Sequence, residues 1–480
     1  MQNECDDLRD YIRVLEKANW LKKVEGAHWK LEIGTICEMN GERDGPALLF
    51  DKIKDYPEGY RLLTNCIFKP KKVQRLAFGI PDDMSDKDII SDWKDKLYNF
   101  KPNPPVEVKT GPILENVLTG DDIDMFKFPT PFWHEMDGGR YIGTGDVSIN
   151  RDPDTGFVNV GTYRVMIHDK DLLSYFQAPG AHGAMIREKY WAKGQDCPVV
   201  VCFGQDLMVF AASTLQMPWG VGELDFAGYL KGRPIEVIRD DVTGLPIPAT
   251  AEIAIAGFVP PPEKESRMEG PFGEWTGYYA SKAANRPVLH VKKLYHRNNP
   301  VMLGAPLSKV EPGYYEIPIH YAPFLWERLL AIGMPGIQGV WSYGRGYRTT
   351  AVISVKQSYL GHAQAVGTIA AVVARGGAMA GKFTIVVDDD IDPSNWEEVS
   401  WALSTRVDPE TAIEILHGHS NTPLDPSIPP EKGARADYTT ARVLINACKP
   451  YSWMKDFPPV ITSSPEIRKL VEEKFGYLFQ

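Results

Sequence analysis

The sequence predicts a mixed α/β (α+β) protein, with enough chain for about three domains at the usual ~150 residues per domain. Three observations lead to this prediction. An amphipathic helix opens the chain, short β-branched and aromatic runs fill its middle, and strand-like and helix-like segments alternate in its final third. Hydrophobic residues make up 43% and charged residues 24%, which excludes a mainly disordered chain and a fibre.

The first element is a helix, because Leu8, Tyr11, Ile12 and Leu15 recur at helical spacing after a possible cap at Asp6 or Asp7. A turn-rich stretch with short apolar runs follows. The proline-rich segment 101–106 should be extended, and it is a plausible hinge to the next domain.

From about residue 112 to 310 the sequence predicts mainly strands, separated by Gly, Pro, Asp and Asn at spacings typical of β-sandwiches and barrels. One helix is expected near 182–193. The predicted strand runs are 157–165, 198–203, 207–211, 252–259 and 288–291.

The final third alternates between predicted strands at 349–355 and 382–387 and predicted helices at 361–374 and 395–403. Alternation of this kind indicates an α/β layer. Ser464 followed by Pro465 predicts a last helix that runs to about residue 478.

Charge and composition exclude several classes of protein. The chain has 53 basic and 63 acidic residues, a formal net charge of −10, which disfavours nucleic acid as a partner. No stretch approaches ~18 consecutive apolar residues, and the acidic start has no signal-peptide pattern. Six cysteines without a CxxC pair disfavour a disulfide framework and a zinc ribbon. We therefore expect a cytoplasmic protein that binds neither nucleic acid nor membrane.

The sharpest local feature is a pair of acids, Glu269 and Glu274, on either side of Gly-Pro-Phe-Gly. Residues five apart point to opposite faces of a strand and lie ~140° apart on a helix. Only a turn lets both carboxylates address one cleft, and Gly270, Pro271 and Gly273 supply it. Such a pair suits acid–base work, because repulsion and burial can keep one acid protonated near neutral pH. The alternative is an exposed polar hairpin tip.

Asn159, Arg164, His182 and Glu223 are further candidates. Arg164 can hold a carboxylate with two hydrogen bonds. If 159–164 is a strand, Asn159 and Arg164 can lie on the same face only where a bulge interrupts it, and Gly161 is a natural place for one. His182 follows a Pro-Gly turn and Glu223 a Gly-rich loop. Asn, His and Glu together suit Mn²⁺ or Mg²⁺. An ordinary edge strand and a capping histidine are the alternatives, and sequence separation alone cannot show that these residues meet.

Three other patterns are weaker. The segment 376–382 has P-loop spacing, but Phe383 stands where Ser or Thr is needed and the segment runs from helix to strand, so only a single phosphate contact from Lys382 is retained. The acidic run 388–392 predicts a solvated strand end with the next helix cap rather than a metal cluster. His417 and His419 would lie in a loop that could line a pocket.

The motif EGPFGEWTGY at 269–278 strongly resembles that of the UbiD-type decarboxylases, which use prenylated FMN. The likeness covers roughly residues 5–460, with further elements in family order: NVGTYR at 159–164, PGAH at 179–182, the stretch 212–228, VDDDID at 387–392 and WALSTR at 401–406. The fold that it implies has an N-terminal α/β domain (1–111), a central flavin-binding domain resembling a split β-barrel (112–315) and a C-terminal α/β oligomerisation domain (316–480).

The resemblance also implies roles for individual residues. Asn159, His182 and Glu223 match the positions that hold Mn²⁺ (or Mg²⁺) against the cofactor phosphate, and Lys382 matches the lysine that reaches this phosphate. A neighbouring K⁺ site, which uses backbone carbonyls, is matched by Ala212, Ser213, Leu215 and Glu223. The cofactor-binding positions implied are Asn159, Val160, Gly161, Thr162, Tyr163, Arg164, Ala181, His182, Glu223 and Lys382.

The activity implied is reversible, non-oxidative decarboxylation of an aromatic or other unsaturated carboxylic acid, with a hydroxybenzoate-like acid as first guess. Loss of CO₂ from an sp² carbon requires an electron sink, which the prenylated flavin supplies in this family. Arg164 would orient the carboxylate, Glu269 would hold Arg164, and protonated Glu274 would return the proton. A UbiX-type flavin prenyltransferase would supply the cofactor, and the chain would form a homo-oligomer, a dimer or a hexamer.

Other functions stay open at this point. These are a carboxylase or a non-catalytic subunit of a multi-subunit enzyme, a flavin oxidoreductase on the same scaffold, and a metal-dependent hydrolase using Asn159, His182 and Glu223. Movement of the C-terminal domain over the cofactor should exclude water. Candidates for binding a ring hydroxyl of the substrate are Tyr314, Tyr315, His417 and His419.

Overall fold

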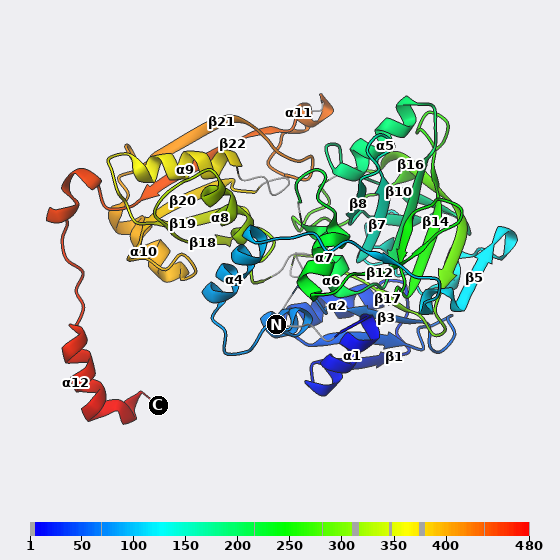
Figure 1. Cartoon of the computed structure of the whole chain (residues 1–480), viewed down its shortest axis with the longest axis horizontal. Coiled ribbons are helices and arrows are strands. Elements are labelled where there is room, and N and C mark those ends of the chain that lie inside the picture. Colours follow the sequence, from blue (N-terminus) through cyan, green and yellow to red (C-terminus); the bar gives the residue numbers. More distant parts are fainter. Residues whose placement is uncertain are drawn as a thin grey trace.

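The computed structural model describes residues 5–68, 70–215, 217–280, 282–309, 316–344, 348–373, 380–435 and 437–479. It contains three bodies of secondary structure (Figure 1): an N-terminal body at the bottom, a large central sheet on the right and a C-terminal α/β layer on the left. The predicted mixed α/β class is confirmed.

The N-terminal body is built on a four-stranded sheet. Its strand order is β1 (Leu21–Glu25), β2 (Ala47–Asp51), β3 (Arg61–Thr64) and β17 (Val301–Leu303), so a strand from far along the chain completes it. The helices are α1 (Leu8–Lys17), α2 (Glu32–Gly41), α3 (Lys71–Phe78) and α4 (Asp86–Tyr98). Helix α1 buries the four predicted apolar residues, and Asp7 caps it by accepting a hydrogen bond from the Asp10 N–H.

The central sheet has ten strands and is strongly curved (Figure 1). Its order is β6-β9-β10-β16-β14-β11-β7-β8, and β5 and β15 both pair with the long strand β16. These strands are β5 (Asn116–Thr119), β6 (Arg140–Gly143), β7 (Asp146–Arg151), β8 (Val158–Gly161), β9 (Val165–Ile167), β10 (Leu172–Tyr175), β11 (Cys197–Phe203), β14 (Ile253–Val259), β15 (Ser266–Glu269) and β16 (Ala284–His296). A small separate sheet holds β4 (Val106–Glu107), β12 (Glu236–Arg239) and β13 (Pro246–Pro248).

Three helices pack against β8, and the first two also pack against β7: α5 (His182–Ala192), α6 (Leu207–Thr214) and α7 (Glu223–Lys231). The helix predicted near 182–193 and the strands predicted at 198–203 and 252–259 are confirmed. The strand predicted at 207–211 is wrong, because this segment is α6, whose first N–H groups are capped by the Asp206 carboxylate. The run predicted at 157–165 is two strands, β8 and β9, with residues 162–164 between them.

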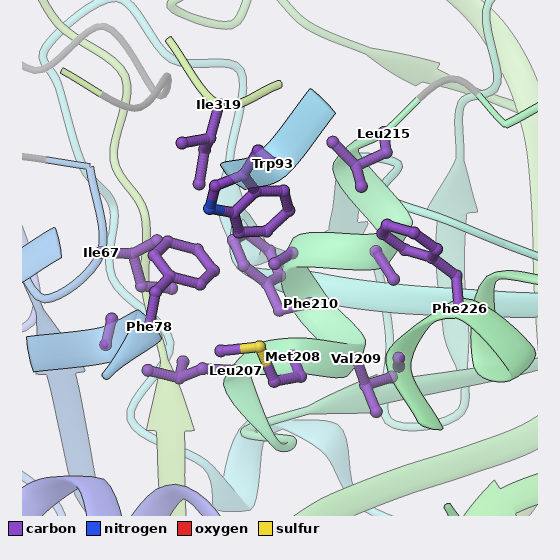
Figure 2. Close-up of a cluster of buried hydrophobic side chains, with 14 of the residues drawn as sticks. Ile67, Phe78, Trp93, Leu207, Met208, Val209, Phe210, Leu215, Phe226 and Ile319 are labelled. Atoms are coloured by element: carbon purple, nitrogen blue, oxygen red, sulfur yellow. The ribbon is translucent and has the colours of Figure 1, made fainter. Parts of the chain in front are cut away.

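The position of α6 in the hydrophobic core explains why its sequence predicted a strand. Side chains around the whole circumference of α6 are buried, so its sequence carries no 3.6-residue pattern. Figure 2 shows Leu207, Met208 and Phe210 gathered with Phe78 and Trp93 of the N-terminal body. The same buried cluster continues to Trp326 and Leu444 of the C-terminal body, so one core joins all three bodies.

The C-terminal body is a five-stranded sheet in the order β18-β19-β20-β22-β21, with helices packed on it. The strands are β18 (Ile337–Tyr343), β19 (Thr350–Val355), β20 (Phe383–Asp388), β21 (Ile413–Ser420) and β22 (Thr439–Ala447). The helices are α8 (Ala322–Ala331), α9 (His362–Val373), α10 (Trp396–Arg406), α11 (Pro430–Ala434) and the outlying α12 (Pro465–Phe475). The predicted alternation of strands and helices is confirmed, as is the last helix.

Two local predictions in this body need correction. The acidic run 388–392 is solvated at Asp389 and Asp390, but Asp388 is buried and accepts hydrogen bonds from Arg406 at 3.1 Å and from the Lys449 N–H at 2.6 Å. The N-cap of the next helix is Asn395, outside this run. His417 and His419 lie in strand β21, next to a register shift, and not in a loop.

Among the described residues, no helix combines the length and apolarity needed to cross a bilayer.

Candidate active site

Arg164, Glu269 and Glu274 form a buried cluster, called here the arginine cluster. Arg164 lies between β8 and β9, Glu269 ends β15, and Glu274 follows the Gly-Pro turn. The Arg164 guanidinium donates through Nε to Glu269 Oε1 at 2.8 Å and through Nη2 to Glu269 Oε2 at 2.9 Å. Its Nη1 donates to the Glu274 carboxylate. The turn thus brings both acids to one guanidinium.

Burial controls the protonation of this cluster. The side chains of Arg164, Glu269 and Glu274 are 8%, 1% and 7% exposed. Burial raises the pKa of Glu274, and the charge of Glu269 adds to this rise while Arg164 opposes it. Burial and the nearby Glu269 carboxylate therefore both shift Glu274 toward its protonated form.

Residues that the sequence did not single out support the cluster. The Tyr141 hydroxyl, on β6, donates to Glu269 Oε1 at 2.8 Å, and its ring is fully buried. The buried Asp137 carboxylate accepts from the Gly273 N–H at 3.4 Å and so holds the turn that precedes Glu274. These partners lie more than a hundred residues from the acids in the chain, and no local spacing signals them.

A second arginine, Arg286 on β16, also faces these acids. Its Nε lies 3.8 Å from Glu269 Oε2. The guanidinium carbons of Arg164 and Arg286 lie 4.4 and 4.3 Å from the ring centre of Phe176, so both cations stack on one aromatic ring. Burial lowers the pKa of Arg286, and the neighbouring Arg164 lowers it further, while Glu269, Tyr438 and Glu274 oppose this.

Asn159, His182 and Glu223 lie on three neighbouring elements, β8, α5 and α7, and are called here the Glu223 cluster. The Glu223 carboxylate, at the start of α7, accepts from the Val160 N–H on β8 at 2.8 Å, beside Asn159. The Asn159 amide donates to Asn150 Oδ1 at 3.3 Å, and the Asn150 amide in turn donates to the Gly183 carbonyl at 3.0 Å, beside His182. Short contacts therefore link the three elements that carry these residues.

The charges of the Glu223 cluster suit a bound cation. Burial raises the pKa of Glu223 to about 8, which marks a carboxylate whose negative charge is poorly compensated. Burial lowers the pKa of His182 and keeps its imidazole neutral, the form that ligates metals. Among the described residues no three His, Cys, Asp or Glu side chains gather as a metal site, and this cluster has two of these types plus an asparagine. Its donors fit the implied Mn²⁺ or Mg²⁺.

The residues implied for K⁺ lie at the carboxyl end of α6. Ala212 and Ser213 belong to its last turn and Leu215 is its C-cap, where backbone carbonyls carry the negative end of the helix dipole. The Ser213 hydroxyl lies 2.7 Å from the Thr162 hydroxyl, which connects α6 to the segment after β8. Gly161 is required there, because an added Cβ would meet Tyr163 at 2.6 Å. Ala181 is the N-cap residue of α5, immediately before His182.

Lys382, His417 and His419 all belong to the C-terminal body. Lys382 donates to Asp425 at 3.0 Å and to Ser427 at 2.9 Å, within the C-terminal body. His417 is exposed and His419 is half-buried on β21. Tyr314 and Tyr315 lie outside the described residues.

Three family models match consecutive parts of the chain. They describe the N-terminal, Rift-related and C-terminal domains of 3-octaprenyl-4-hydroxybenzoate carboxy-lyase, at residues 12–93, 105–309 and 317–447. The pyrrole-2-carboxylic acid decarboxylase of Pseudomonas aeruginosa is 30% identical over 99% of this chain and 99% of its own.

Solved structures agree with these matches. The vanillic acid decarboxylase of Sedimentibacter hydroxybenzoicus, in closed form, has a TM-score of 0.87 at 28% identity, over 99% of both chains. Its open form has a TM-score of 0.80 at 27% identity, also over 99% of both chains. A UbiD-class enzyme of Pelotomaculum thermopropionicum, in an evolved dimeric form with prFMN, has a TM-score of 0.79 at 26% identity, over 97% of this chain and 98% of that one.

A sheet of this order, the paired acids on one arginine, and matches that span the whole chain define a carboxy-lyase. The chain belongs to the UbiD family.

Proposed function

We propose that this enzyme catalyses the reversible, non-oxidative decarboxylation of an aromatic or other unsaturated carboxylic acid, with prenylated FMN as cofactor. The observation that carries the proposal is the arginine cluster, in which one buried guanidinium donates two hydrogen bonds to Glu269 and also contacts Glu274, an acid whose pKa burial raises. A hydroxybenzoate-like acid is the first substrate to test.

The residues of the cluster divide the work. Arg164 can grip a substrate carboxylate with its Nη1 edge, which now contacts Glu274, while Glu269 holds the other edge of the guanidinium. When the bond to CO₂ breaks, its electron pair stays on the substrate carbon, and Glu274 donates its proton to that carbon. The burial of all three side chains keeps water from competing as the proton donor.

Prenylated FMN, when bound, would supply the electron sink that a carbanion at an sp² carbon requires. Asn159, His182 and Glu223 would hold Mn²⁺ (or Mg²⁺) at its phosphate, and the backbone carbonyls of Ala212, Ser213 and Leu215 with Glu223 would hold K⁺. The poorly compensated charge of Glu223 and the neutral imidazole of His182 support this assignment. Lys382 would reach the phosphate by exchanging its contact with Asp425.

The relatives support an aromatic substrate, because those named above act on pyrrole-2-carboxylic and vanillic acids. A UbiX-type prenyltransferase would supply the cofactor, as the family resemblance implies. Further copies of the chain are the expected partners, in a dimer or a hexamer. The dimeric relative supports this.

The test is to co-express the chain with a UbiX-type prenyltransferase, identify the bound cofactor by mass spectrometry, and screen aromatic and heteroaromatic acids for CO₂ release. Prenylated FMN together with CO₂ release supports the proposal. Hydrolysis that needs metal but no flavin, or redox turnover with plain FMN, would replace it with another function.

A further inference from the structure

One contact between the C-terminal body and the central sheet lies directly beside the arginine cluster. The guanidinium carbon of Arg348, just before β19, lies 4.2 Å from the ring centre of Trp275, the residue that follows Glu274. Both residues are buried, with 8% and 6% of their surface exposed. The Arg348 carbonyl accepts from the Gly381 N–H at 2.9 Å, which anchors Arg348 to the segment that leads into β20.

This contact depends on how the two bodies are placed. Arg348 belongs to the C-terminal body and Trp275 to the segment after β15, so separation of the bodies would break the contact. The chain superposes better on the closed form of the Sedimentibacter enzyme than on its open form, with TM-scores of 0.87 and 0.80. The arrangement in which Arg348 covers Trp275 is thus the one nearer to a closed enzyme.

A buried guanidinium needs a partner that compensates its lost hydration. Burial lowers the pKa of Arg348. The face of the Trp275 indole carries a negative electrostatic potential, which attracts the guanidinium. If the bodies separated, Arg348 would regain water and Trp275 would lose its cover. Glu274, which precedes Trp275 in the chain, would then lose part of its burial.

We propose that Arg348 is a positioning residue for Glu274: its guanidinium, delivered by the C-terminal body, seats on Trp275 and completes the burial of the acid only when the enzyme is closed. The inference rests on the proposed role of Glu274 as proton donor. It goes beyond that role by naming the residue pair that ties domain closure to the acid.

The charged groups that face Glu274 set the direction of the effect. Arg164 and Arg286 favour its ionised form, whereas burial and the charge of Glu269 favour its protonated form. Loss of the Arg348 contact removes burial and leaves the two arginines in place, so Glu274 should give up its proton at lower pH. A second link supports the coupling, because the electrostatic interaction with Tyr438, a residue of the C-terminal body, raises the pKa of Arg286.

The first test needs no turnover. Small-angle X-ray scattering of the full-length holoenzyme should show a larger radius of gyration for Arg348→Met and for Trp275→Leu than for wild type. The ratio of closed to open molecules should fall by about 2- to 30-fold, which is the stabilisation that a cation–aromatic contact contributes, from an exposed to a buried site. Arg348→Lys keeps the charge but stacks less well, so it should fall between wild type and Arg348→Met.

The matched control is Lys293→Met. It removes a cation that lies 5.3 Å from the Tyr295 ring, within the central sheet, and it should leave the scattering unchanged. Wild-type scattering for Arg348→Met and Trp275→Leu alike would overturn the proposal, whatever the substrate of the enzyme is. Absence of turnover in wild type, by contrast, counts against the proposed function alone.

The second test is the pH profile of turnover. In Arg348→Met the loss of activity at alkaline pH should set in at lower pH than in wild type, because Glu274 is better hydrated. A purely structural role would lower the amount of folded protein, or the amplitude of the profile, without moving this limb. An unmoved limb would overturn the link to Glu274.

Discussion

Two clusters beside the central sheet each contain a buried acid, and they balance its charge in different ways. The arginine cluster contains its own cation, since Arg164 contacts both Glu269 and Glu274. In the Glu223 cluster the carboxylate receives a backbone N–H from Val160, a dipole rather than a charge. Burial raises the pKa of an acid in each cluster, Glu274 in one and Glu223 in the other.

The difference separates two uses of a buried acid. An acid with an internal cation can hold or release a proton without losing its place, which suits proton transfer. An acid without one attracts a cation from solution, which suits a metal that anchors a phosphate. Charge balance, rather than the presence of buried acids, thus distinguishes the proposed chemistry from the proposed anchoring.

The largest effect should come from Glu274→Gln, which keeps the size of the side chain but removes the proton that it donates. Turnover should fall by about 10²–10⁴-fold, the usual contribution of a positioned acid. Deuterium uptake from D₂O into the decarboxylated product should be lost with it. Glu265→Gln, four residues before Glu269 and outside the cluster, is the control and should stay near wild type. Equal uptake by both variants would assign the acid elsewhere.

The second effect concerns the other cluster. Glu223→Gln removes the charge that should bind Mn²⁺, so metal affinity should drop by at least about 10-fold, with flavin occupancy falling as well. Elemental analysis and flavin absorbance measure the two quantities. Asp225→Asn, on the same helix and half-buried, should retain both. Full metal and flavin content in the Glu223 variant would contradict the anchoring role.

The third effect is a pH dependence of stability. Because the pKa of Glu274 is raised in the folded state, the native protein keeps a proton that the unfolded chain has released above its ordinary pKa. The wild-type free energy of unfolding should therefore fall as pH rises toward the raised pKa, by at most about 1.4 kcal/mol per pH unit. Glu274→Gln does not titrate, so urea unfolding at pH 5 and pH 8 should show the variant gaining relative to wild type. Parallel curves would mean that Glu274 is ionised throughout.

The smallest effect should follow Tyr141→Phe, which removes one hydrogen bond to Glu269. A bond of this kind contributes about 0.5–1.5 kcal/mol, so turnover should fall by roughly 2- to 10-fold. Tyr295→Phe loses a comparable buried bond, to Asp240 at 2.6 Å, and should change stability but not turnover. An unaffected Tyr141 variant would show that Arg164 alone positions Glu269.

Features of the fold and the site that depend on residues close together in the chain could be predicted from the sequence. Helix α1 was predictable because its apolar residues lie on one face, and the meeting of Glu269 and Glu274 was predictable because a Gly-Pro turn separates them. Helix α6 was not, because it is buried all round. The supports of the arginine cluster were not either, since Tyr141 and Glu269 are 128 positions apart and meet only through the strand order of the sheet. The roles of individual residues came from the family resemblance, and spacing alone would have left them open.

The interleaved connections of the N-terminal body bear on how this protein can be divided. Strand β17, late in the chain, completes the N-terminal sheet beside β3, and α4, early in the chain, packs against α8 of the C-terminal body. A cut between residues 100 and 112 would therefore separate β3 from β17, one of its two neighbours, and α8 from α4. Recombination with relatives should succeed only where β3 travels with β17 and α4 with α8, so the unit of exchange in this fold is a set of paired elements, not a stretch of sequence.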